Sequence, residues 1–197
     1  MKQSQNDAVM PSLFASLKST ESMPLASRED LERLITKDSM VSSLTMAYRK
    51  RMDISKSYAD ELKPLGPAIS ALLQYDGRGR SLENVKAETK MLALDYDIHD
   101  VPAEQLDGIF KAACQSAYAL AVYHTISGQG IRIIVGYDRA ENCDLTIVDL
   151  FNAIIKKAIS FYNTLPTGRP TSRPPTSADS AALPTPLMPT STGRQSP

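Results

Sequence analysis

The chain has 197 residues, of which 42% are hydrophobic, and this suits one domain with a proper core and flexible ends rather than two domains. Basic and acidic residues each total 22, so the overall charge gives no reason to expect nonspecific adhesion to nucleic acid or anionic lipid. The N-terminal stretch MKQSQNDAVM has no apolar leader and no apolar run approaches about 18 residues, so we expect a soluble, cytoplasmic protein without a membrane segment.

The first 26 residues are weakly patterned, although SLFASL can form a short strand or a hydrophobic hook. A helix is predicted from Ser27, because Ser27 and Asp30 form a capping-box-like start before an apolar face. Residues 40–48 suit a strand or a helix equally well. Residues 60–85 read as a loop and a strand that prolines, glycines and the turn DGRGR interrupt.

The pattern becomes clearer from residue 91 onward. MLALDYDI over 91–98 alternates as a strand does, and Pro102 suits the first turn of a helix. AYALAVYHTI and IRIIVGYD then predict a β-hairpin that Ser127, Gly128, Gln129 and Gly130 connect. Asp144 is expected to cap a long amphipathic helix, and the Pro/Ser/Thr-rich residues 166–197 are expected to be a disordered tail.

This order of strand, helix, hairpin and helix predicts the α+β class. We expect an antiparallel or mixed sheet with helices packed on one face, in the manner of ferredoxin-like or RNA-recognition folds. The domain is expected to span residues 27–165, between a weakly structured segment 1–26 and the tail 166–197.

Asp95 and Asp97 are the sharpest chemical signal. A strand places residues two apart on one face, within reach of one divalent cation, and two like charges there require a counter-ion. Mg²⁺ or Mn²⁺ bridging to substrate phosphates is the usual chemistry of such pairs. The alternative is that both acids end the strand and cap the turn that follows.

The hairpin turn and a basic stretch supply two further candidates. Glycines permit close approach to a phosphate, so Ser127, Gly128, Gly130 and Arg132 are candidate nucleotide-phosphate contacts, unless the loop only turns the chain. Candidate nucleic-acid contacts lie in a run that is either a binding groove or a solvated surface: Arg49, Arg51, Lys63, Arg78 and Arg80.

Cysteine and histidine are sparse in this chain. Cys114, Cys143, His99 and His124 lack the spacing of a zinc site or a disulfide framework, so we expect no zinc and two buried thiols. No catalytic triad is legible, and no residue is assigned as catalytic on the sequence.

Taken in order, these pieces resemble the VirE N-terminal family, whose members look like divergent primase-polymerases of bacterial mobile elements. The resemblance covers residues 39–165 through YRKRMD, LKPLGPAI, LDYD and SGQGIRI. It implies metal binding by Asp95 and Asp97, phosphate binding by the hairpin, and a nucleotidyltransferase of the primase type in DNA replication. It also implies a helicase-like partner or fused region.

Two departures from that family bear on activity. Primase-polymerases usually carry a histidine where Arg132 stands, and family members continue into a further strand with another acidic position. The expected function is therefore an incomplete or weakly active primase-polymerase-like domain. The alternative is a catalytically inactive module of the same fold that binds nucleic acid or a partner protein.

Overall fold

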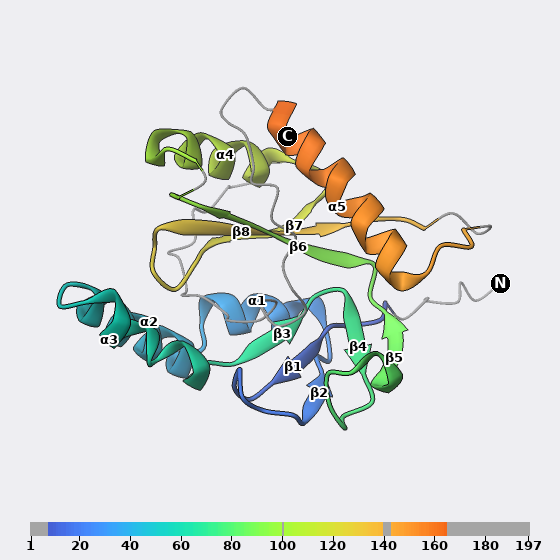
Figure 1. Ribbon diagram of the computed structural model, residues 1–197, viewed down its shortest axis with the longest axis horizontal. Helices are drawn as coiled ribbons and strands as arrows, with labels where there is room; N and C mark the ends of the chain where they lie inside the picture. Colours follow the sequence, from blue (N-terminus) through green and yellow to red (C-terminus); the bar gives the residue numbers. More distant parts are fainter. Residues whose placement is uncertain (1–7, 100, 140–142, 165–197) are drawn as a thin grey trace, which may run out of the picture.

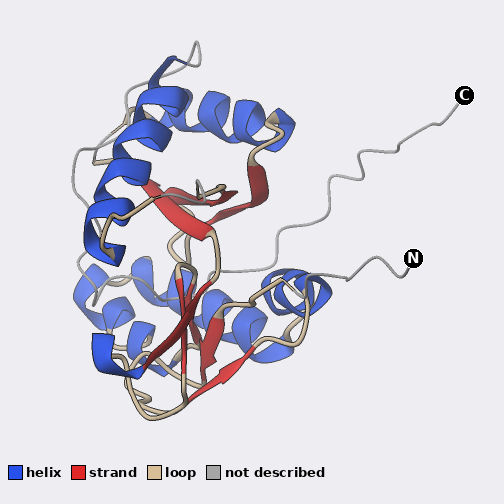
Figure 2. Cartoon of the chain, turned by 90° about the vertical axis from the view of Figure 1, so that its right-hand side faces the viewer, coloured by secondary structure: helices blue, strands red, loops and turns tan. Residues whose placement is uncertain are grey.

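The computed structural model describes residues 8–99, 101–139 and 143–164, and the tail predicted for 166–197 lies outside these ranges. Two structural layers lie one above the other in Figure 1. The upper layer holds the sheet of β6, β7 and β8 under α4 and α5, and the lower layer holds the N-terminal helices and the shorter strands (Figures 1 and 2).

The upper layer is built from the strand, helix, hairpin and helix that the sequence predicts. Its elements are β6 (Met91–Asp97), α4 (Ala103–Gln115), β7 (Ala119–His124), β8 (Gly130–Gly136) and α5 (Ile147–Thr164). The strands pair antiparallel in the order β6-β8-β7. The α+β class is therefore confirmed.

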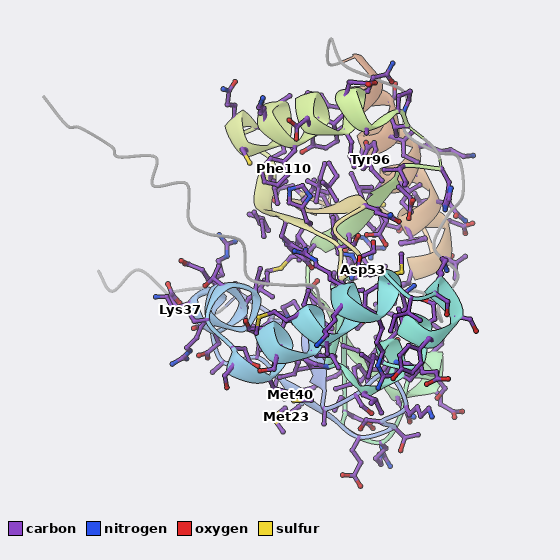
Figure 3. The ribbon with its side chains drawn as sticks, turned by 90° about the vertical axis from the view of Figure 1, so that its left-hand side faces the viewer. Met23, Lys37, Met40, Asp53, Tyr96 and Phe110 are labelled. Carbon is purple, nitrogen blue, oxygen red and sulfur yellow. The ribbon has the colours of Figure 1, made fainter. Side chains whose placement is uncertain are left out.

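Side chains that alternate along β6 fill two separate cores. Leu92, Leu94 and Tyr96 pack under α4 and α5, on the same side of the sheet as the labelled Phe110 in Figure 3. Met91 packs on the opposite face, with residues of α1 (Arg28–Thr36). Helices thus cover both faces of this sheet, where the sequence analysis placed them on one.

The lower layer contains three helices and five short strands. The helices are α1, α2 (Ser39–Met52) and α3 (Lys56–Asp60), and the 3-10 turns are η1 (Lys63–Leu65) and η2 (Leu82–Asn84). The strands β1 (Ser12–Phe14), β2 (Ser22–Pro24) and β3 (Ala68–Ser70) form one sheet, and β4 (Leu73–Tyr75) pairs with β5 (Val85–Glu88). Regular structure therefore begins well before Ser27.

Helix caps agree with the sequence at one end of the chain and differ at the other. The Ser27 side chain accepts a hydrogen bond from the Asp30 backbone N–H, as the capping-box pattern predicts. Residues 40–48 are helical, because Asp38 caps α2 in the same way. At α5 the cap is Thr146, whose Oγ1 accepts from the Asp149 N–H, and the expectation of Asp144 is corrected.

Candidate functional site

Asp95 and Asp97 lie on the face of β6 that is turned away from α4 and α5. The register pairs Asp95 with Arg132 and Asp97 with Gly130, so both acids lie beside β8 and the start of the hairpin. The structure therefore brings together the two predicted acids and the predicted phosphate motif. Their partners, however, differ from those that the sequence analysis expected.

A bidentate ion pair joins Asp95 to Arg132. The Arg132 Nε and Nη2 atoms donate to the two carboxylate oxygens of Asp95 at 2.5 and 2.8 Å. The Arg132 side chain is 8% exposed and that of Asp95 is 42% exposed, so a buried cation lies beneath a carboxylate that water reaches. The counter-ion that the acid pair requires is thus supplied by the protein itself at Asp95.

Tyr123 completes this buried polar cluster from β7. Its side chain is 1% exposed, and it lies in register with Arg132 on β8. Burial raises the pKa of Tyr123 to about 12, so the phenol stays neutral over the range in which proteins are stable. Asp95, Arg132 and Tyr123 thus form a polar cluster across β6, β8 and β7, on the face of the sheet toward the lower layer.

Asp97 closes a turn at the end of β6. Its Oδ1 accepts a hydrogen bond from the His99 backbone N–H at 3.2 Å, which is the strand-ending role given above as the alternative to metal binding. Tyr48 lies close enough for the Asp97 charge to contribute to the raised pKa of that phenol, of which burial is the main cause. Asp97 therefore lies at the end of β6, near Tyr48 of α2.

The hairpin tip uses its own polar groups to close the turn. The Gly128 N–H donates to the Thr125 carbonyl, and the Gln129 N–H donates to the Ser127 Oγ. Gly128 has φ of +73°, the left-handed region that favours glycine. These N–H groups are occupied, so the structure gives the Gly-rich loop a turn-forming role, and phosphate binding by Ser127, Gly128 and Gly130 stays a prediction.

Arg49 connects the hairpin tip to α2. Its Nε donates to the Ile126 carbonyl at 3.3 Å, and a Cβ atom added to Gly128 would lie 3.3 Å from the Arg49 guanidinium carbon. Ile126 packs into a small apolar cluster with Tyr48, Ala59 and Leu62. Of the predicted nucleic-acid contacts, Arg49 thus fixes the hairpin against the lower layer.

The remaining basic candidates divide between two places. Arg51 and Lys63 lie with Lys56 on α2, α3 and η1, whereas Arg78 and Arg80 belong to the turn between β4 and β5. Arg78 pairs with Asp76 in that turn, and the Arg80 guanidinium stacks over Phe14 at 4.0 Å. The five residues therefore come from two different parts of the lower layer, and their role in nucleic-acid binding stays a prediction.

Asp60 organises the basic surface on α3, and the sequence analysis did not single it out. It accepts hydrogen bonds from the Tyr48 hydroxyl at 2.7 Å and the Lys56 ammonium at 2.7 Å, and it pairs with the Lys63 ammonium at 2.8 Å. Burial alone would raise the pKa of Asp60, but the bonds from Lys56, Lys63 and Tyr48 outweigh burial and hold that pKa below its usual range. The sequence signals of this network are the spacing of Lys56 and Asp60 by four residues and that of Asp60 and Lys63 by three.

The acid pair is a poor fit to a divalent cation in this arrangement. Both oxygens of Asp95 bind Arg132, and Asp97 uses one oxygen within its turn. Within residues 8–99, 101–139 and 143–164, no three His, Cys, Asp or Glu side chains gather as a metal site requires.

The two cysteines differ from the expectation of two buried thiols. Cys114 is exposed and Cys143 is half-buried, so that expectation is corrected.

One comparison with known proteins identifies a family. Residues 62–167 match the family described as "BT4734-like, N-terminal domain", which is more than half of the chain. The chain therefore belongs to this family. No curated protein and no solved structure matches the chain.

This match corrects the family drawn from the sequence. The resemblance to the VirE N-terminal family, and through it to primase-polymerases, is replaced by membership of the BT4734-like N-terminal family. The matched range begins at Leu62, so β6, the β7–β8 hairpin and α5 lie within it, and α2 and α3 precede it.

Among the described helices, none combines the length and apolar character that spanning a bilayer requires.

Proposed function

We propose that this domain is a nucleic-acid-binding module that contacts phosphates through a basic surface on α2, α3 and η1. We call this surface the basic ridge and define it by Lys50, Arg51, Lys56 and Lys63. The observation that supports it most directly is the gathering of these cations on one contiguous helical unit in a chain whose overall charge is zero. The ridge is therefore a local feature of the surface.

The charges on the ridge leave a positive surplus. Residues 49–63 contain five basic residues, which are Arg49 and the four ridge residues, and three acidic ones, Asp53, Asp60 and Glu61. Asp60 holds the ammonium groups of both Lys56 and Lys63, which places two cations on one carboxylate. Phosphate contacts by such lysines supply affinity without sequence selectivity, because the phosphate backbone is the same for every sequence.

An aromatic ring lies within the ridge. Tyr58 is 40% exposed, and the Arg51 guanidinium lies 4.1 Å from the centre of its ring. Cations interleaved with exposed aromatic rings are typical of surfaces that bind single strands, because bases stack on the rings while the cations contact phosphates. This arrangement favours a nucleic acid over an acidic protein as the ligand.

The test is a binding titration with fluorescently labelled oligonucleotides, single-stranded and duplex. We expect the unmodified chain to bind with an affinity that falls as salt rises, and the variant Lys56→Gln/Lys63→Gln to bind more weakly with a salt slope smaller by about 2. Arg78→Gln, which removes an exposed cation from the β4–β5 turn, is the matched control and should change neither quantity. Equal affinity and slope in the ridge variant and the control would contradict the proposal.

Metal-dependent nucleotidyl transfer by Asp95 and Asp97 stays a prediction from the sequence. Melting-temperature measurements with Mn²⁺ and a nucleoside triphosphate separate it from the binding function. A metal-dependent rise in melting temperature that Asp97→Ala abolishes would support the enzymatic reading. Oligonucleotide binding that persists in Asp97→Ala without such a rise would support the binding module.

A further inference from the structure

A groove lies at the opposite end of the sheet from Asp97, beside the start of β6 and the end of β8. Its volume is about 620 Å³, and its walls include Tyr118, Leu120 and Tyr137 above Met91. Its lining also includes two basic and two acidic residues, Arg28, Lys90, Glu88 and Asp138. A smaller hollow of about 310 Å³ between α1 and β7 shares Arg28, Met91 and Leu120 with it, so the two hollows adjoin.

Two tyrosines line this groove, of which Tyr118 is exposed and Tyr137 is half-buried. Tyr118 is 62% exposed, and its ring meets that of Phe161, which is 40% exposed, edge to face at 5.5 Å. Tyr137 is fixed in place by the hydrogen bond that its hydroxyl donates to Glu88 at 2.6 Å. Grooves with fixed, exposed aromatic rings recognise proline-rich segments, because the polyproline II helix is already extended before it binds.

The last described helix contacts one residue of this groove. The Tyr162 hydroxyl lies 3.4 Å from the Ser116 Oγ, and Phe161 contacts Tyr118, so the C-terminal turn of α5 packs against the residues that lead into β7. The described residues end at Thr164, two positions beyond Tyr162. The segment 165–197 that follows is rich in proline, at positions Pro166, Pro170, Pro174, Pro175, Pro184, Pro186, Pro189 and Pro197.

We propose that the proline-rich segment 165–197 docks in cis into the groove lined by Tyr118, Leu120 and Tyr137. Ten residues in polyproline II conformation extend about 30 Å, so a segment of this length can reach the groove from Thr164 and follow it. Its prolines can pack against the rings of Tyr118 and Tyr137, as proline-rich segments do in aromatic-lined grooves. This proposal is independent of nucleic-acid binding by the basic ridge.

The chain contains no tryptophan, which permits a site-specific fluorescent reporter. In Tyr118→Trp we expect a blue-shifted emission and protection from acrylamide quenching in the otherwise unmodified chain. Both should be lost when the eight prolines of 165–197 are replaced by serine, at equal chain length. Tyr58→Trp, on the basic ridge, is the matched control and should give the same emission with either tail.

A synthetic peptide of residues 165–197 added to the serine-tailed chain should restore the blue shift of Tyr118→Trp. Identical emission of Tyr118→Trp with both tails, together with no response to the peptide, would overturn the proposal. A blue shift that disappears on dilution would assign the docked segment to a second copy and overturn docking in cis.

A second measurement does not depend on the tryptophan substitution. Amide hydrogen exchange of Ala117, Tyr118 and Leu120, which line the groove, should be slower in the unmodified chain than in the serine-tailed chain. Equal exchange in the two chains would overturn the proposal even if Tyr118→Trp did not fold.

Discussion

Replacing Asp95 by alanine is expected to destabilise the domain, because it leaves the Arg132 guanidinium buried without its carboxylate. Removing one partner of a fully buried ion pair costs about 3–5 kcal/mol. The Asp95 side chain is 42% exposed, so water enters the vacated position and screens part of this cost. We therefore expect a loss of about 2–3 kcal/mol, which lowers the melting temperature of a domain of this size by about 4–12 °C.

Urea unfolding followed by circular dichroism measures this loss, with Asp97→Ala as the matched control. Asp97 accepts a single turn hydrogen bond, so its removal should cost no more than about 1 kcal/mol. The double variant Asp95→Ala/Arg132→Met should recover much of the loss, because it removes the buried charge as well. If Asp95 and Asp97 instead formed an unneutralised pair, Asp95→Ala would relieve repulsion, and unchanged or increased stability would refute the reasoning.

Three further predictions concern residues of the hairpin and of α2. Gly128→Ala should cost about 1–2 kcal/mol in urea unfolding, because alanine is strained at φ of +73° and its Cβ would press against the Arg49 guanidinium. Tyr48→Phe should cost about 1.5–3 kcal/mol by the same assay, because it removes a hydrogen bond to the charged Asp60, and an unchanged midpoint would contradict that role. Burial and the nearby Arg49 lower the pKa of His124, so its contribution to stability is present above the unfolded pKa of about 6.5 and is lost as pH falls through the folded pKa. In His124→Gln the thermal unfolding curve should lose this part of its pH dependence.

Local patterns were sufficient to predict the upper layer. The alternation in MLALDYD, the β-branched runs of the hairpin and the apolar stripe of the last helix each depend on residues near in sequence, and the structure has β6, β7, β8 and α5 there. α2 stayed ambiguous because its buried residues are Val41, Thr45 and Tyr48. A buried threonine hides the helical period from a pattern of apolar residues alone.

The hydrogen-bonding partners of Asp95 and Asp97 could not be predicted from local sequence patterns, because they depend on pairing between strands that are distant in the sequence. Sequence reasoning established that Asp95 and Asp97 share a face and require a counter-ion, and both statements agree with the register of β6. Arg132 lies 37 residues from Asp95, and only the antiparallel pairing of β6 with β8 places the two side chains together. Without the strand register, the sequence is therefore compatible both with a metal site at Asp95 and Asp97 and with an internal ion pair between Asp95 and Arg132.

The register of β6 and β8 also explains why Gly130 and Arg132 have different roles. Gly130 stands opposite Asp97, where an added Cβ atom would lie 2.6 Å from the Tyr96 carbonyl, so glycine is required there by the close approach of β6 and β8. Arg132, two residues further along β8, lies on the same face and neutralises Asp95. Sheet geometry and charge balance thus explain Gly130 and Arg132 in the motif SGQGIR, and the phosphate contacts that we propose lie on the basic ridge. Variants of Lys56 and Lys63 are for this reason a more direct probe of nucleic-acid binding than variants of the hairpin, whose effects on affinity would be mixed with effects on folding.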